Sequence, residues 1–299
     1  MSAARRSAWA RLRADLRLAR RQVWRTKGSS ALVMLLVALP VAGLAGAAVT
    51  VQSHIPTPQQ RAELELGHAQ AWLAVAGGPD PSRTQNPAEP WDNTVARDEA
   101  GNPLHPAEPA PADPSAALPA GTRTIELLDQ GVVFVKTATG IGQVSATVGP
   151  AWDPVFAGRF SIIQGDAPTT ADGAMASPGM LRRLGAAVGD RVTLADSGRS
   201  YLITGTMRRM DLPASEDQLF LPDSARDQVS GMAQWYTPDW QPTATELSRL
   251  NHAGFIVYGR DLAVHARQAE GDSSRAWTIL MVGAIVAVFC GYLVVLLAG

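Results

Sequence analysis

The sequence predicts an α+β domain outside the cytoplasm, flanked by two transmembrane α-helices. Three observations lead to this fold class: an uncharged apolar run near each end of the 299 residues, and short strand-like and helix-like segments between the runs. We therefore expect five parts. They are a cytoplasmic basic amphipathic helix (1–28), a first transmembrane helix (29–53), an extracytoplasmic α+β domain (54–275) with a flexible proline-rich insertion (77–121), and a second transmembrane helix (276–299).

The first apolar run, residues 31–51, is long enough to cross a bilayer. At about 1.5 Å per helical residue it spans roughly 30 Å, the thickness of the hydrocarbon core. It contains no charged residue, and Pro40 is tolerated because neighbouring groups in membrane helices satisfy the freed carbonyl. The small residues 45–47 suggest a cleaved signal peptide as an alternative. We favour an uncleaved anchor, because the basic segment and the apolar run both exceed the usual lengths in signal peptides.

Charges before this run set its orientation. Residues 1–27 contain nine Arg and Lys against Asp15 alone, whereas the whole chain has a net charge of −1. The positive-inside rule places the N-terminus in the cytoplasm and the acidic remainder outside. Apolar residues at helical spacing favour an amphipathic helix on anionic headgroups over a disordered basic tail. A nucleic-acid-binding arm is disfavoured beside a membrane span, so we expect no nucleic acid partner.

Turn and helix signals divide the region after Pro56. A short helix should end at Gly67 and be followed by a strand over 69–75. Residues 77–121 contain ten prolines and few large apolar residues, so we expect them to bury too little to become ordered. Cys290 is the only cysteine, which excludes an internal disulfide in the domain.

The compact part resumes at Thr122. A helix within 175–184 should begin near Ser177-Pro178 and end at Gly185. We expect residues 211–239 to form an acidic loop with one short strand, and its aromatic residues to serve packing rather than ligand binding. The remaining elements are strands at 131–137, 143–148, 160–163, 192–194, 199–206, 219–221 and 254–258, and a helix at 243–251.

The second apolar run follows Arg275, the last charged residue, and should return the chain to the cytoplasm. Small residues recur at four-residue spacing in both runs, which either allows close helix packing or reflects alanine richness alone. Because the sequence stops at the end of this helix, we expect it to be the front portion of a longer polytopic protein.

Motifs for catalysis are missing from the sequence. A phosphate-binding loop would need glycine where Val135 precedes Lys136-Thr137, and no G-x-S-x-G, H-E-x-x-H or Cys/His metal spacing occurs. Residues 271–273 (Gly-Asp-Ser) hint only weakly at a serine hydrolase. We therefore expect no enzyme, no cofactor, and no catalytic, cofactor-binding or metal-ligating residue.

The order of parts resembles the MacB/FtsX-type ABC transporter permeases. Residues 17–43 (RLARRQVWRTKGSSALVMLLVALPVAG) look like that family's entry sequence. Residues 158–207 are similar to its extracytoplasmic core domain, with a loop, a short helix, L-G-x-x-V-G-D at 184–190, two strands and a glycine turn. The segment RLNHAGF at 249–255 also resembles exported domains of this family.

This resemblance implies a MacB-like periplasmic core fold in a multi-pass protein of a bacterial plasma membrane. It implies a permease subunit that couples a separate cytoplasmic ATPase to movement of the extracytoplasmic domain, for export or mechanotransmission. The implied partners are that ATPase, a second permease copy and the lipid bilayer. The alternative is a membrane-anchored extracytoplasmic binding or sensor module without an ATPase.

Overall fold

The computed structural model describes residues 56–137, 139–213, 215–272, 277 and 280–281. The chain divides into two compact units, Met1–Pro56 and Thr57–Gly299, and we call residues 57–272 of the second unit the body. Within the described ranges, no helix is both long and apolar enough to cross a bilayer. The predicted basic helix, the first span and nearly all of the second span lie outside the described residues.

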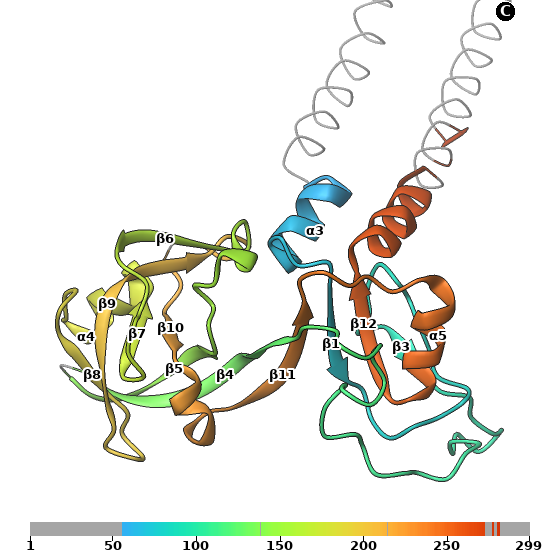
Figure 1. Ribbon diagram of the computed structural model, residues 1–299, viewed down its shortest axis with the longest axis horizontal. Coiled ribbons are helices and arrows are strands. Elements are labelled where there is room, and N and C mark those ends of the chain that lie inside the picture. The colour runs from blue at the N-terminus through green and yellow to red at the C-terminus, as the bar shows by residue number, and fades with distance from the viewer. Residues whose placement is uncertain (1–55, 138, 214, 273–276, 278–279, 282–299) are drawn as a thin grey trace, which may run out of the picture. The chain divides into compact units, whose positions relative to one another are not determined.

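The body is a mixed α/β domain (Figure 1). Its main strands are β1 (Ala71–Val75), β4 (Ile125–Thr137), β5 (Gly140–Val148), β6 (Phe160–Gly165), β7 (Gly173–Ala176), β8 (Arg191–Thr193), β9 (Ser200–Arg209), β10 (Gln218–Leu221), β11 (Ser230–Thr237) and β12 (Phe255–Gly259). Its helices are α3 (Pro58–Leu66), α4 (Pro178–Leu184), α5 (Ala244–His252) and the short 3-10 helices η1 (Pro154–Phe156) and η2 (Asp223–Gln228). Residues 260–272 form a further helix directly after β12.

These strands form one ten-stranded sheet in the order β12-β1-β11-β4-β5-β10-β7-β9-β6, with β8 beside β9. Neighbours are antiparallel except for β10 beside β5 and β7 beside β9, which are parallel. The long strand β4 pairs with β11 through its first half and with β5 through its second half. It therefore connects the strands around β1 to the strands around β9 (Figure 1).

Two predicted helix ends are confirmed. The Ser177 hydroxyl accepts a hydrogen bond from the amide of Met180 at the start of α4, and Gly185 ends this helix with a left-handed φ of 64°. The α3 helix ends at Gly67 with a φ of 60°, and a Cβ there would lie 2.6 Å from the backbone of Phe156. Only glycine fits such a close approach at positive φ.

Both faces of the strands around β1 are buried. Trp72 packs in a cluster with α3, η1 and β11, whereas the next residue, Leu73, packs in a cluster with α5. Successive strand residues point to opposite faces, so β1 is buried on both sides. A third cluster contains residues of α4 and of the strands β4, β5, β7, β8, β9 and β10.

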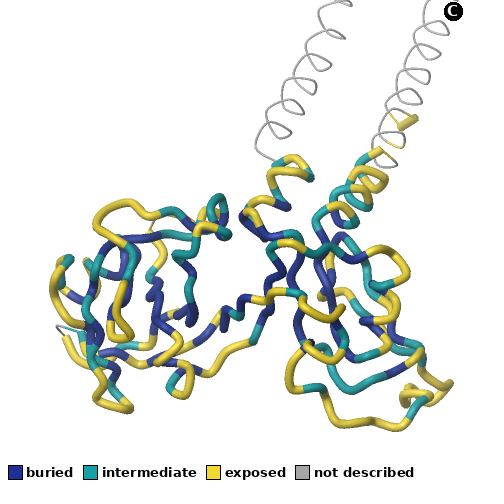
Figure 2. Tube along the Cα trace, in the orientation of Figure 1, coloured by how far each residue is buried: buried dark blue, intermediate teal, exposed yellow. Residues whose placement is uncertain are grey.

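The proline-rich segment 77–121 differs from the expectation that it buries too little to become ordered. It forms the hairpin β2 (Thr84–Gln85) and β3 (Asn93–Thr94), buries Ala88 and packs Leu118 against the α5 cluster. The Gln85 side chain donates to the Val257 carbonyl at 2.6 Å and accepts from the Val257 amide at 2.8 Å. Polar side chains bonded to backbone hold this segment, and a count of apolar residues does not detect them. The rest of it is largely exposed (Figure 2).

The short strand expected at 219–221, within the loop-like region 211–239, is confirmed by β10. The expectation of a loop is wrong at 230–237. There β11 pairs with both β1 and β4. Its first two residues, Ser230 and Gly231, are exposed and polar or small, which hides the strand pattern in the sequence. Trp235 and Tyr236 are buried, so these aromatic residues pack as favoured.

The other predicted elements are confirmed, but two strand segments are missing from the prediction. Helix α4 begins at Pro178, as predicted, whereas strand β7, which ends at Ala176 just before it, has no counterpart in the prediction. Strand β4 begins at Ile125, six residues before the predicted strand at 131–137. In the parts of the chain that the structure describes, the other predicted strands and helices after Thr122 lie within a few residues of their expected bounds.

Candidate functional site

The candidate site is a network of buried charges at a kink in β4. Among the described residues, Gln130 is the only residue other than glycine with a positive φ, 51°. The pairings of β4 with β5 and with β11 both shift register there. Such bulges redirect side chains. At this kink the Asp129 side chain lies inside the body and is 3% exposed.

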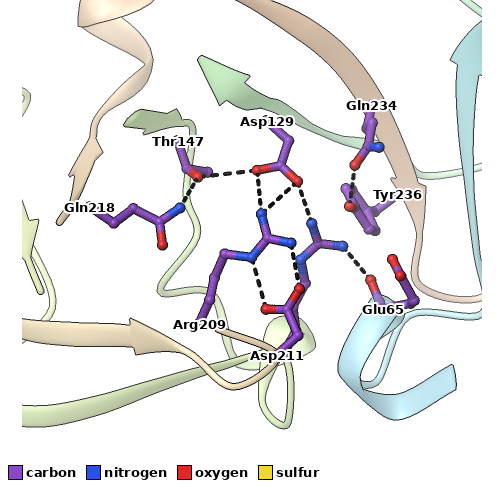
Figure 3. A network of polar contacts seen from close by, with 9 residues as sticks. Glu65, Asp129, Thr147, Arg209, Asp211, Gln218, Gln234 and Tyr236 are labelled. Carbon is purple, nitrogen blue, oxygen red and sulfur yellow. Dashed lines mark hydrogen bonds and ion pairs between the residues drawn. The ribbon is translucent and has the colours of Figure 1, made fainter. Parts of the chain in front are cut away.

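The Asp129 carboxylate binds two guanidinium groups (Figure 3). Arg159 donates to Oδ2 at 2.7 Å, and Arg209 donates to both oxygens at 3.0 and 3.1 Å. Burial alone would raise the pKa of Asp129, but the charges of Arg159 and Arg209 outweigh burial and hold this pKa below its ordinary value. Asp129 is therefore an ionised carboxylate between two cations.

Arg159 joins this ion network to the helix at the start of the body. Its Nη1 donates to the backbone carbonyl of Glu65 in the last turn of α3. Its guanidinium carbon also lies 5.3 Å from the ring centre of Phe160 and 5.1 Å from that of Tyr236, within the range of cation–π attraction. One buried side chain thus contacts α3, β4, β6 and β11.

Arg209, the last residue of β9, extends the network to a second carboxylate. Asp211 accepts from Arg209 Nε at 3.0 Å and from Nη2 at 2.7 Å in a forked arrangement. Burial would lower the pKa of Arg209, but its hydrogen bond to Asp211 and the charge of Asp129 raise it above the ordinary value. Arg209 therefore remains a cation between two acids.

Glu65 adds a third acid beside the two cations. Burial raises the pKa of Glu65 above 4.5, and the positive charge of Arg159 opposes this only in part. If Glu65, Asp129 and Asp211 were all ionised against Arg159 and Arg209, the network would hold one excess negative charge. The raised pKa of Glu65 acts to reduce this excess.

A neutral branch continues the network toward β10. The Thr147 hydroxyl donates to Asp129 at 3.3 Å and accepts from the Gln218 amide at 3.1 Å. On the other side, the Tyr236 hydroxyl donates to Gln234 at 2.6 Å. These bonds tie side chains of β4, β5, β10 and β11 into the same interior (Figure 3).

The two ends of the body are also fastened to each other. Arg260, the first residue of the helix at 260–272, donates from its backbone amide to the Gln70 carbonyl at 2.9 Å. Its guanidinium donates to the carbonyls of Gly67, just after α3, and of Ala69, the latter at 2.8 Å. Arg260 therefore holds the start of the last helix against the end of α3.

A second bridge links the same two helices through the proline-rich segment. Glu89 lies 3.5 Å from Arg61 in α3 and 3.0 Å from Arg267 in the helix at 260–272. Ala62 and Ala263 of these helices belong to one buried cluster. The two helices therefore share one buried cluster and are bridged by charge.

The network contains charges rather than a reacting group. In the described ranges, no group of three or more His, Cys, Asp and Glu side chains could hold a metal ion. Ser273, the serine of the Gly-Asp-Ser segment that weakly suggests a serine hydrolase, lies outside the described residues. The expectation that the chain has no catalytic, cofactor-binding or metal-ligating residue stays a prediction.

No family model and no curated protein matches the sequence. The body is similar to three solved structures of membrane transport proteins. One is a domain of a protein designated a permease, from Porphyromonas gingivalis, with 14% identity, 66% of this chain and 97% of that chain covered, and a TM-score of 0.35. The second is the periplasmic region of MacB from Actinobacillus actinomycetemcomitans, with 9% identity, coverages of 68% and 95%, and a TM-score of 0.40.

The third structure is the extracellular domain of the noncanonic ABC-type transporter YknZ from Gram-positive bacteria. Its identity is 11%, it covers 47% of this chain and 83% of its own, and its TM-score is 0.33. These neighbours are of the kind that the sequence resembles. With TM-scores below 0.5, their likeness adds nothing about what this chain binds or does.

Sequence reasoning missed the ion network, although two signals for it exist. Arg159 is a lone cation in the apolar stretch 155–163, and Asp129 is the one charged residue within 127–135. A single charge inside an apolar strand pattern needs a buried partner. The sequence offers no means to pair these two residues, which are thirty positions apart.

Proposed function

We propose that this chain belongs to the permease subunit of an ABC transporter and that its body transmits movement on the outer side of the membrane. The observation that carries the proposal is the buried Arg159, which joins α3 to Asp129 in β4 and, through Asp129, to Arg209 in β9. The α3 helix begins at Pro58, seven residues after the end of the first apolar run at Val51. Displacement of that run would therefore reach the far strands of the sheet.

Buried ion pairs suit this task because they resist separation. Removing one partner of such a pair costs about 3–5 kcal/mol, since it leaves an uncompensated buried charge. Sliding of apolar side chains past one another carries no comparable penalty. The segments that contact Asp129, Arg159 and Arg209 therefore move as one unit.

The contacts of Arg260 and Glu89 connect the first and last helices of the body, which a lever also requires. The helices that enter and leave the body are held together, so tilting of both produces one rigid-body rotation of the sheet. The energy comes from a separate cytoplasmic ATPase that binds its nucleotide differently in the two positions. A second permease copy and the bilayer complete the assembly, with the N-terminus in the cytoplasm.

Co-purification and distance measurements test this function. The full-length protein is extracted from membranes with mild detergent, and the bound ATPase is identified. In a Cys290→Ser background, spin labels are placed at the exposed Gln59 in α3 and Asp196 in the β8–β9 turn. We expect the distance between these two labels to stay constant on ATP addition. The distance between the Asp196 labels of two copies should change.

Variants separate coupling from simple stability. Arg159→Gln should make the distance from Gln59 to Asp196 respond to ATP and should reduce the change between copies. Arg191→Gln, which removes an exposed ion pair with Asp172 at 2.8 Å, is the matched control and should behave as wild type. Failure to recover any ATPase with a folded chain, or copies whose label distance ignores ATP, would refute the proposed function.

A further inference from the structure

A cavity of about 470 Å³ lies beside the ion network, between η1, β6 and the end of β9. This volume is within the range of about 300–1,000 Å³ found for sites that bind small molecules. Most of its lining is apolar or aromatic. The side chains that form these walls are Trp152, Phe156, Phe160, Ile162, Met207 and Met210.

Two apolar side chains of the cavity lining are also exposed. Ile162 is 41% exposed and Met210 is 38% exposed. Clustered exposed apolar residues mark binding surfaces more often than scattered ones do. The apolar surface thus continues from inside the cavity to the outside of the body.

The cavity lining contains few polar side chains. Asp153 accepts a hydrogen bond from the Val155 amide at 2.9 Å, and its other oxygen lies 3.9 Å from Arg123. Ser161 is the one other polar side chain among the lining residues. A polar ligand would find few partners, whereas Met207 and Met210 adapt their flexible side chains to apolar ligands of variable shape. The cavity therefore favours a purely apolar group.

Chain length limits the distance between this cavity and the membrane. Gly158, in the cavity lining, is so close to Glu63 of α3 that a Cβ would lie 2.8 Å from Glu63 Cγ. Along α3 and the extended chain before it, Glu63 is at most about 25 Å from residue 53, where the predicted first span ends. The bilayer is thus the nearest source of apolar chains.

We propose that this cavity binds an acyl chain of a bilayer phospholipid. The proposal rests on the membrane anchoring in the proposed function and adds a lipid site to the body itself. A phospholipid is favoured over a free fatty acid because the bilayer that anchors the chain consists of phospholipid.

Photo-crosslinking tests this site. The full chain is reconstituted into phosphatidylcholine vesicles that contain a phosphatidylcholine with a diazirine at the end of one acyl chain. After irradiation and digestion, mass spectrometry maps the adducts. We expect adducts on peptides covering 151–162 or 207–210, in addition to adducts in the two predicted spans.

Polar substitutions at the cavity provide the control. Ile162→Gln with Met210→Gln should lower the adduct yield at the cavity, relative to the spans, at least about tenfold, as expected for the loss of a few methylene contacts. Met210→Gln alone, at a half-exposed position, serves if the double variant fails to fold. Ile141→Gln, which is 69% exposed in β5 and outside the cavity, should leave the yield unchanged.

The outcomes distinguish this site from the anchoring on which it rests. Adducts in the spans but not at the cavity overturn the lipid site and leave the anchoring intact. Adducts in neither place overturn both. An equal loss with Ile141→Gln, or adducts at the cavity only with a free diazirine fatty acid, also refutes a phospholipid chain as the ligand.

Discussion

Replacing Arg159 by methionine should destabilise the body strongly. The change removes the cation 2.7 Å from Asp129, a carboxylate with a side chain that is 3% exposed. It also leaves the Glu65 carbonyl without this donor and removes the cation–π contacts with Phe160 and Tyr236. Breaking a buried ion pair costs about 3–5 kcal/mol. Since Arg209 still binds Asp129 at 3.0 Å, we expect the lower end of this range, about 3 kcal/mol, equivalent to a fall of about 10 °C in Tm for a domain of this size.

Thermal unfolding of the full chain in detergent, followed by near-UV circular dichroism, measures this loss. Arg191→Met breaks the exposed pair with Asp172 and should leave the Tm nearly unchanged, because water and salt screen such a pair. Asp129→Asn added to Arg159→Met should cost less than the two single changes together by about 1–3 kcal/mol, because it removes the uncompensated charge. An Arg159→Met variant as stable as Arg191→Met would contradict the buried network.

Three further changes test other features. Because burial raises the pKa of Glu65, the stability from this group is complete below pH 4.5 and is lost as pH rises through the raised pKa. Over that pH interval the Tm of wild type should fall relative to the Tm of Glu65→Gln. Parallel curves of Tm against pH for the two proteins would contradict this. Gly67→Ala should lower the free energy of unfolding by more than about 1 kcal/mol, and by more than Gly101→Ala does, because both glycines have positive φ but only Gly67 is crowded. Thermal unfolding of the two variants measures the difference. Gln85→Ala removes both bonds to Val257, so hydrogen exchange at the Val257 amide should accelerate about tenfold or more; unchanged exchange would refute the role of Gln85.

Local chemistry explains which elements could be predicted. Gly67 and Gly185 end helices through their own backbone freedom, and Pro178 starts one because its missing amide has no partner to lose there. These signals lie within a few residues of the element they control. The sequence therefore indicates helix ends and short strands well.

Pairing over long distances explains what could not be predicted. Strand β11 is a central strand because β1 and β4 lie on either side, and neither is close to it in sequence. The ion network likewise depends on the bulge at Gln130, which brings Asp129 to Arg159 and Arg209. A lone buried charge can be recognised in a sequence, but its partner becomes known only when the fold brings the two together.

The bonds between Gln85 and Val257 also bear on solubility. Strand β12 ends the ten-stranded sheet, and the last strand of a sheet can pair with strands of other chains. The amide of Gln85 occupies both the N–H and the C=O of Val257, so an incoming strand must first displace it. We expect a chain without residues 77–121 to expose this edge and aggregate, which makes the insertion a protection against misassembly.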